Sequence, residues 1–176
     1  MKLTSNKLWI FQDDDINTDV IFPGRYTYDP LTPEQMATHA MEDYKPNFAK
    51  EVSEGDIIIA GNNFGAGSSR EQAVTCLKAA GVSCIITKSF ARIYFRNAIN
   101  EALPLVISPE CSSLILDKKD EYQDEQITVD FDNGIINTKN SEFRFPKLDE
   151  QALKIFQAGG LVNYTKNRLK EKNLDH

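Results

Sequence analysis

Two serines and an arginine, Ser68, Ser69 and Arg70, follow a glycine-rich turn in the middle of the chain. The turn at 61–67 comes directly after Ile57–Ala60, an apolar run typical of a strand buried on both faces. Ligands of open α/β sheets bind at the carboxyl ends of such strands, and free N–H groups at a helix start favour an anion there. An arginine at that point can hold a carboxylate. A serine can move a proton at the neighbouring carbon if its alkoxide is stabilised.

The elements around this turn are predicted to form a βαβ unit. Arg70–Ala80 has helical spacing, with Ser68 and Ser69 as its expected caps and Gly81 as its end. Val82–Thr87 is a second apolar strand. A strand, a helix and a strand within about thirty residues predict two parallel strands joined by a right-handed crossover.

The remaining elements follow from apolar patterns and cap residues. They are a strand at Lys7–Phe11, a helix from Thr32-Pro33 to Met41 or Tyr44, a helix at Ser89–Asn100 capped by Ser89, a strand at Leu105–Ile107, a hairpin with its turn at Asn133-Gly134, and helices at Glu150–Gln157 and Leu161–Leu174, the last with a frayed, charged tail. No internal repeat or linker divides the chain. The expected fold class is α/β, with a central partly parallel sheet flanked by helices, in a single domain over residues 1–176 with a C-terminal helical extension.

The composition excludes several classes of protein. The chain has 176 residues, a net charge of −6 and 41% hydrophobic residues, which is ordinary for a soluble globular protein. The negative charge argues against a nucleic-acid partner, because phosphates favour a basic face. No apolar run approaches the roughly 20 residues that cross a bilayer, and the N-terminus lacks a signal-peptide pattern. We therefore expect a cytoplasmic protein that binds neither nucleic acid nor membrane.

Metal binding by this chain is not indicated. Cys76, Cys84 and Cys111 are an odd number of cysteines without CxxC spacing, so they are predicted to be small buried hydrophobic residues. The segment 13–19 crowds four aspartates into seven residues, but its spacing does not match a calcium-binding EF-hand loop. A solvated turn is the simpler interpretation.

The sequence fits two other enzyme classes less well. A serine hydrolase needs a general base, and the only histidines are His39, in a predicted surface helix, and His176, the last residue. The spacing of Gly61, Gly65 and Gly67 is similar to the glycine turn of some nicotinamide dehydrogenases, but the second strand ends without an acid to hold a ribose. A nicotinamide-dinucleotide-binding module therefore remains as the alternative of another class.

Three motifs in order carry a family resemblance. Gly61–Glu71 resembles the signature of the swivel domain in the aconitase superfamily, Asp15–Arg25 resembles its first active-site loop, and Ser89–Pro104 resembles the helix that follows. The resemblance covers about residues 7–108, and the length is similar to that of a free-standing small subunit, as in 3-isopropylmalate dehydratase and homoaconitase. It implies a β/β/α swivel fold that closes over a large partner subunit. That partner would carry the [4Fe-4S] cluster, with no cofactor on this chain.

The resemblance also implies roles for single residues. Ser68 would be the catalytic base, working as an alkoxide, and Asp19 the active-site aspartate. Arg70 would hold a substrate carboxylate, and Arg25 matches a second substrate arginine. The other residues expected at the substrate are Ser69 and Gly67, which would support the alkoxide, and Tyr26, Thr27 and Tyr28, which follow Arg25.

The implied reaction is a reversible loss and re-addition of water on a hydroxy-polycarboxylate, and this chain alone would be inactive. Tyr26 and Tyr28 can pack on an isopropyl group, and the loop adds no cation beyond Arg25. This favours the isomerisation of 2-isopropylmalate to 3-isopropylmalate in leucine biosynthesis. Homoaconitate and a dimethylmalate or citramalate are the alternatives, because tyrosine hydroxyls can also donate to a carboxylate.

Overall fold

The computed structural model describes residues 1–174, and the side chains of residues 1–170. The strands are β1 Lys2–Thr4, β2 Leu8–Ile10, β3 Asp56–Ala60, β4 Val82–Thr87, β5 Leu105–Ile107, β6 Thr128–Asp130, β7 Ile135–Asn137 and β8 Glu142–Arg144. The helices are α1 Thr18–Ile21, α2 Pro33–Ala37, α3 Phe48–Glu51, α4 Gln72–Ala79, α5 Arg92–Asn100, α6 Pro109–Asp117, α7 Lys119–Tyr122, α8 Glu150–Gln157 and α9 Leu161–Leu174, with a 3₁₀ turn at Gly24–Tyr26.

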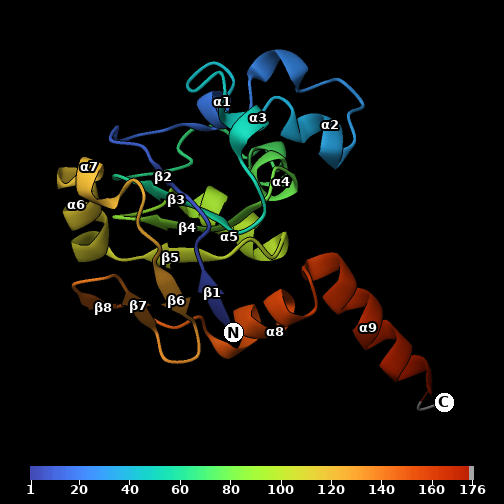
Figure 1. Ribbon diagram of the computed structural model, residues 1–176. Coiled ribbons are helices and arrows are strands. Elements are labelled where there is room, and N and C mark those ends of the chain that lie inside the picture. Colours follow the sequence, from blue (N-terminus) through green and yellow to red (C-terminus); the bar gives the residue numbers. More distant parts are fainter. Residues whose placement is uncertain (175–176) are drawn as a thin grey trace.

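A parallel sheet lies at the centre of the molecule, in the order β2-β3-β4-β5 (Figure 1). Ile58 of β3 pairs with Trp9 of β2 on one side and with Ile85 of β4 on the other. β3, α4 and β4 form the βαβ unit that the sequence predicted, with its strands parallel. The carboxyl ends of β2, β3 and β4 consequently lie at one edge, and the loops that follow them are brought together.

A separate antiparallel sheet has the order β1-β6-β7-β8. The predicted hairpin is β6 and β7, but β1 and β8 were not expected from the sequence. Both are three residues long, and β1 pairs with a strand far along the chain, with Leu3 opposite Val129. The expected α/β class is confirmed. The division into one parallel and one antiparallel sheet was not foreseen, because short strands with distant partners leave little local signal.

The two faces of the parallel sheet bury two apolar clusters. Successive side chains of a strand point to opposite faces, so Ile58 packs towards α4 and α5 while Ile57 and Ile59 face the other way. On that second face they meet α6 and the antiparallel sheet, including Val129 and Ile136. The molecule therefore has three layers, with the parallel sheet in the middle (Figure 1).

Two predicted helix caps are wrong. α4 begins at Gln72 and α5 at Arg92, and neither has a side-chain cap. Ser68 bonds instead to Thr18, and the Ser89 hydroxyl accepts from the backbone N–H of Asn63 at 2.8 Å. Partners in neighbouring loops thus replace the caps expected from local sequence.

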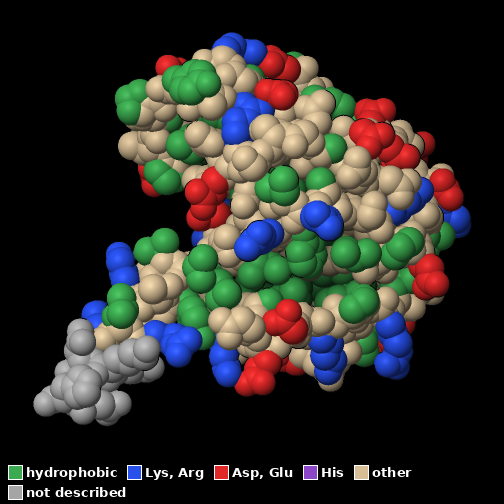
Figure 2. All heavy atoms as spheres, turned by 180° about the vertical axis from the view of Figure 1, so that it is seen from behind, with side chains coloured by type: hydrophobic (Ala, Val, Ile, Leu, Met, Phe, Trp, Pro, Cys, Tyr) green, Lys and Arg blue, Asp and Glu red, His purple; other side chains and the backbone are tan. Residues whose placement is uncertain are grey.

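The capping box of Thr32 and Gln35 is confirmed, although α2 is shorter than predicted. The chain leaves the helix after Ala37 and turns until Met41, whose φ of 57° is left-handed. Further along, Figures 1 and 2 agree that α9 projects from the body of the molecule. None of the helices within residues 1–174 has the length and apolar character that a membrane span requires. Residues 175–176 of the expected charged tail lie outside the described part.

Candidate active site

The loop after β3 is hydrogen-bonded between the loops after β2 and β4. On one side Gly65 N–H donates to the carbonyl of Ile16 at 2.7 Å, and Thr18 N–H donates to the carbonyl of Ala66 at 2.8 Å. On the other side Phe64 N–H donates to the carbonyl of Ser89 at 3.1 Å. These bonds explain why three motifs that are separated in sequence meet at one edge of the sheet.

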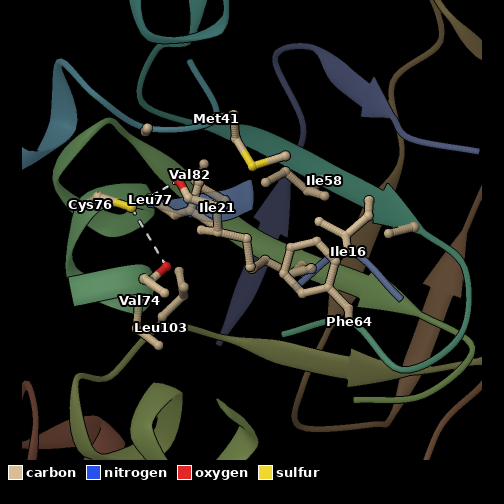
Figure 3. Packing of buried hydrophobic residues seen from close by; sticks show 14 of the residues in the cluster. Ile16, Ile21, Met41, Ile58, Phe64, Val74, Cys76, Leu77, Val82 and Leu103 are labelled. Atoms are coloured by element: carbon tan, nitrogen blue, oxygen red, sulfur yellow. Dashed lines mark hydrogen bonds between the residues drawn. The ribbon is translucent and has the colours of Figure 1, made fainter. Parts of the chain in front are cut away.

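The loop after β2 is held by a cap and by the apolar core. The side chain of Asn17 accepts from the N–H groups of Asp19 and Val20 at 2.9 and 3.0 Å and so starts the single-turn helix α1. Ile16 and Ile21 flank that turn and are buried. Figure 3 shows both in the core around α4. The positions of Thr18 and Asp19 are therefore fixed by packing on either side of them.

Ser68 is exposed at this edge and has two side-chain partners. Its Oγ lies 2.9 Å from Oγ1 of Thr18 and accepts from Nε of Arg70 at 2.8 Å. The backbone N–H of Ser68 also donates to Thr18 Oγ1 at 3.1 Å. Thr18 thus bonds to both the backbone and the side chain of the serine. A negative charge on Ser68 Oγ would meet two donors, because an alkoxide leaves Thr18 as the donor of their shared bond.

Arg70 is held by three side chains. Besides Ser68 it donates from Nη1 to Thr27 Oγ1 at 2.8 Å and from Nη2 to Asp19 Oδ1 at 2.5 Å. Only 14% of the Arg70 side chain is exposed, against 66% for Asp19. A guanidinium has five N–H donors, so these bonds leave one N–H on each terminal nitrogen. The group is oriented in advance and can still donate to a carboxylate.

Two glycines allow the close approach of these loops. A Cβ on Gly24 would lie 2.7 Å from Asp19 Oδ1, and one on Gly67 would lie 3.1 Å from Thr18 Oγ1. Gly67 also has a φ of +104°, which side-chain-bearing residues rarely adopt. Any other residue at these positions would strain the turn or displace its partner.

Arg25 and Tyr26, which were also predicted to contact substrate, have other partners. Arg25 donates to both Asp43 oxygens, from Nη1 at 2.7 Å and from Nη2 at 2.9 Å, and it also bonds to Glu42. The ring of Tyr26 stacks on His39 with centroids 3.9 Å apart, and its hydroxyl donates to Glu42 at 3.0 Å. The structure therefore holds Arg25 on a pair of carboxylates and away from the bonds around Arg70.

Ion pairing shifts the pKa values of Arg25, Asp43 and Glu42. Hydrogen bonds from Arg25 lower the pKa of Asp43, and the bond to Asp43 raises the pKa of Arg25. Burial opposes ionisation of Glu42, but its bonds from His39, Tyr26 and Arg25 leave its pKa below the ordinary value. All three groups therefore stay charged at neutral pH.

The predicted site residues thus divide into groups. Ser68, Arg70, Asp19 and Thr27 are joined by hydrogen bonds. Ser69 is their neighbour, and its carbonyl accepts from the Asn97 side chain at 3.1 Å. Tyr28 is 96% exposed on the surface.

Sequence reasoning missed three contributors, Thr18, Glu42 and Asp43. Thr18 could have been noticed, because it lies beside Asp19 in the motif already singled out. Glu42 and Asp43 gave no such signal, since they lie outside every motif.

The cysteines lie in the core, as predicted. All three are buried, and burial raises the pKa of Cys111 to about 12 and those of Cys76 and Cys84 further above the ordinary thiol value. Metal binding by cysteine needs the thiolate, which these surroundings disfavour. Among the described side chains of residues 1–170, no three of His, Cys, Asp or Glu come close enough to hold a metal ion.

Comparison with known proteins places this arrangement in a family. Residues 8–110 match the aconitase C-terminal domain family. The chain is 50% identical to the 3-isopropylmalate dehydratase small subunit of Hydrogenobaculum sp. (strain Y04AAS1), over 95% of this chain and 98% of that one. It is 48% identical to the 2,3-dimethylmalate dehydratase small subunit of Eubacterium barkeri, over 86% of this chain and 90% of that one.

A solved structure has the same fold. The crystal structure of a 3-isopropylmalate dehydratase from Methanocaldococcus jannaschii superposes with a TM-score of 0.86 at 38% identity and covers the whole of both chains. The family match spans more than half of the sequence, and it includes the loops that carry Thr18, Ser68 and Arg70. The chain belongs to the aconitase C-terminal domain family, and its relatives there are the small subunits of dehydratases.

Proposed function

We propose that this chain is the small subunit of a two-subunit hydro-lyase that isomerises 2-isopropylmalate to 3-isopropylmalate in leucine biosynthesis. The observation that carries the proposal is Ser68 Oγ within hydrogen-bond distance of both Arg70 Nε and Thr18 Oγ1. A serine in that setting suits proton abstraction next to a bound carboxylate. The names of the relatives support the same reaction class.

In the proposed mechanism Ser68 takes the proton from the carbon beside the substrate carboxylate. Its alkoxide accepts hydrogen bonds from Arg70 Nε and from Thr18, which lowers the free energy of the charged form. When water is added back, Ser68 returns a proton to carbon. The same serine therefore serves both halves of the isomerisation.

Arg70 binds the carboxylate with the N–H groups that its protein partners leave free. Asp19 and Thr27 keep the guanidinium from turning away, so the substrate carbon is placed against Ser68. Ser69 and the Gly67 amide are proposed to support the charge from the backbone side, and the Ser68 amide acts through Thr18 Oγ1, to which it donates.

The large subunit is proposed to carry the [4Fe-4S] cluster expected for this superfamily. When bound, such a cluster supplies a Lewis acid for the hydroxyl group that leaves. The residues of this chain orient the substrate and move its proton, and the buried cysteines at 76, 84 and 111 do not fit a ligand set. A cytoplasmic location remains a prediction from the sequence.

The third substituent of the substrate distinguishes the candidates. Tyr26, Thr27 and the exposed Tyr28 are proposed to line its pocket when the large subunit covers this loop, which suits an apolar branch. A 2,3-dimethylmalate is the second candidate, because a relative that is 48% identical carries that name. Homoaconitate requires a free cation, which the ion pairs of Arg25 do not provide.

The test is reconstitution of this chain with the large subunit from the same source under anaerobic conditions. We expect isomerisation of isopropylmalate by the complex and none by either chain alone. The same preparation is assayed with dimethylmalate, citramalate, homoaconitate and citrate. A preference of tenfold or more for a tricarboxylate, about 1.4 kcal/mol, would refute the substrate assignment. Turnover by this chain alone would refute the two-subunit assignment. Saturable NADH binding would favour the dinucleotide module.

A further inference from the structure

The turn that carries Arg25 lies directly on the proposed active site. Gly24, the residue before it, approaches so closely that a Cβ there would be 2.7 Å from Asp19 Oδ1 and 3.5 Å from Arg70 Nη1. Thr27, two residues after it, accepts a hydrogen bond from Arg70. The backbone of Arg25 therefore lies next to the proposed binding site of the substrate carboxylate.

The Arg25 guanidinium is nevertheless directed to Asp43 and Glu42. All the hydrogen bonds that it makes within the described residues go to these two carboxylates. One cation facing two anions leaves a net negative group at this border. A further carboxylate would have to displace Asp43 or Glu42 and would be repelled by the remaining charge.

Glu42 is held in place by contacts other than its bond to Arg25. Met41 adopts a left-handed φ of 57°, and its N–H donates to the carbonyl of Ile21 at 2.8 Å. Glu42 follows and bonds to His39 at 2.8 Å and to the Tyr26 hydroxyl at 3.0 Å. Glu42 thus has three partners, and its place does not depend on Arg25 alone.

We propose that Glu42 and Asp43 determine substrate specificity by occupying Arg25, so that this arginine is not free to bind the third substituent of the substrate. This rests on the proposed function and deepens it. The enzyme then selects a malate with an apolar branch and rejects one with a distal carboxylate. Glu42 also holds Tyr26, the residue beside Arg25, because it accepts a hydrogen bond from the Tyr26 hydroxyl.

The experiment neutralises both carboxylates without changing their shape. The variant Glu42→Gln/Asp43→Asn is reconstituted with the large subunit, and kcat/KM is measured for isopropylmalate and for a tricarboxylate, homoaconitate or citrate. We expect the ratio of tricarboxylate to isopropylmalate to rise by about tenfold, which is about 1.4 kcal/mol. The gain should appear mainly in the KM of the tricarboxylate, since a ground-state charge contact has been added.

Two controls separate this effect from a general loss of charge. Adding Arg25→Gln to the double variant should remove the gain, because the freed cation is then absent. Glu34→Gln, on the exposed helix α2 and outside the contacts of Arg25, removes one negative charge and should leave the ratio unchanged. An unchanged ratio in the double variant overturns the proposal. A gain that survives Arg25→Gln, or one that Glu34→Gln reproduces, also overturns it.

Other outcomes are equally decisive. An equal loss of kcat/KM for both substrates would mean that Glu42 and Asp43 only brace the loop, which contradicts the proposal. Asp43→Asn alone serves where the double variant unfolds, because Asp43 is exposed. If the wild-type complex does not act on isopropylmalate, the proposed function fails. In that case the affinities of the wild-type and double-variant complexes for citrate and for citramalate are measured by calorimetry. An unchanged ratio of the two affinities in the double variant overturns this inference independently of the proposed function.

Discussion

Arg70 and Arg25 start from neighbouring loops, and both bind carboxylates, but their surroundings differ. Arg70 is 14% exposed and gives one hydrogen bond to a carboxylate and two to hydroxyl groups. Arg25 is 51% exposed, and in the described part of the chain its guanidinium bonds only to carboxylates. The first group is close to neutral and keeps free donors. The second is negative.

This difference decides what each arginine can do. An arginine that is paired with only one carboxylate can bind another anion at little electrostatic cost. Partial burial of the arginine strengthens its contact with that anion. An exposed arginine with two carboxylates gains little more from a third and contributes little to stability. We therefore expect substitutions around Arg70 to change the rate of the reaction, and substitutions around Arg25 to change selectivity and loop stability.

The largest expected effect is at Ser68. Ser68→Ala in the reconstituted complex removes the proposed base but leaves Arg70 bound to Asp19 and Thr27. The kcat should fall by about 10²–10⁴-fold, the range typical of a lost general base, with a smaller change in substrate affinity. Steady-state kinetics and a binding titration measure the two quantities. Near-normal turnover would show that Ser68 is not the base.

Substitution by lysine compares the two arginines directly. Arg70→Lys keeps the charge but cannot reproduce the bonds to Ser68, Thr27 and Asp19 at once. We expect kcat/KM for isopropylmalate to fall by about 10–100-fold, which is about 1.4–2.7 kcal/mol.

Arg25→Lys is the matched control for this substitution. It should lower kcat/KM by less than about fivefold, because exposed ion pairs are weak. Equal losses for both lysine variants would contradict the proposed division and would restore Arg25 as a substrate ligand.

The convergence of Asp19, Ser68 and Arg70 could be predicted from the sequence because each motif follows a strand of the parallel sheet. The order of parallel strands brings their carboxyl ends together, so local patterns were sufficient to place these residues near each other. The caps assigned to Ser68 and Ser89 were wrong because partners in neighbouring loops outweigh the local preference for a helix start.

The rest depends on contacts that the sequence does not encode locally. Glu42 and Asp43 reach Arg25 only because the chain leaves α2 after Ala37 and reverses at Met41. A left-handed methionine is not expected from its residue type. The strands β1 and β8 are likewise defined by pairing across the chain, with Leu3 opposite Val129 and Phe143 opposite Ile136.

A smaller effect is expected at Thr18, whose hydroxyl bonds to both the backbone N–H and the side chain of Ser68. Thr18→Val keeps the shape of the side chain and removes the donor to the alkoxide. The kcat should fall by about 5–10-fold, since one hydrogen bond of ordinary net strength, about 1–1.4 kcal/mol, is lost. Thr18→Ser is the matched control and should restore most of the rate. Equal defects in the valine and serine variants would assign the loss to packing rather than to the hydroxyl.

The smallest expected effect concerns the ion pairs of Arg25 in acid. The pKa values of Asp43 and Glu42 are lowered in the folded chain from ordinary values of 3.8 and 4.5, so their ionised forms favour folding. That stabilisation is complete above the ordinary pKa values and is lost as the pH falls through the lowered ones. The wild-type chain should therefore melt about 1–2 °C above Glu42→Gln/Asp43→Asn at pH 7. The two Tm values should approach each other as the pH falls below the ordinary pKa values of 4.5 and 3.8, and should coincide only below the lowered ones. A difference in Tm that stays constant to pH 3 would mean that the carboxylates act through shape and not through charge, and the selectivity assigned to them would lose its electrostatic basis.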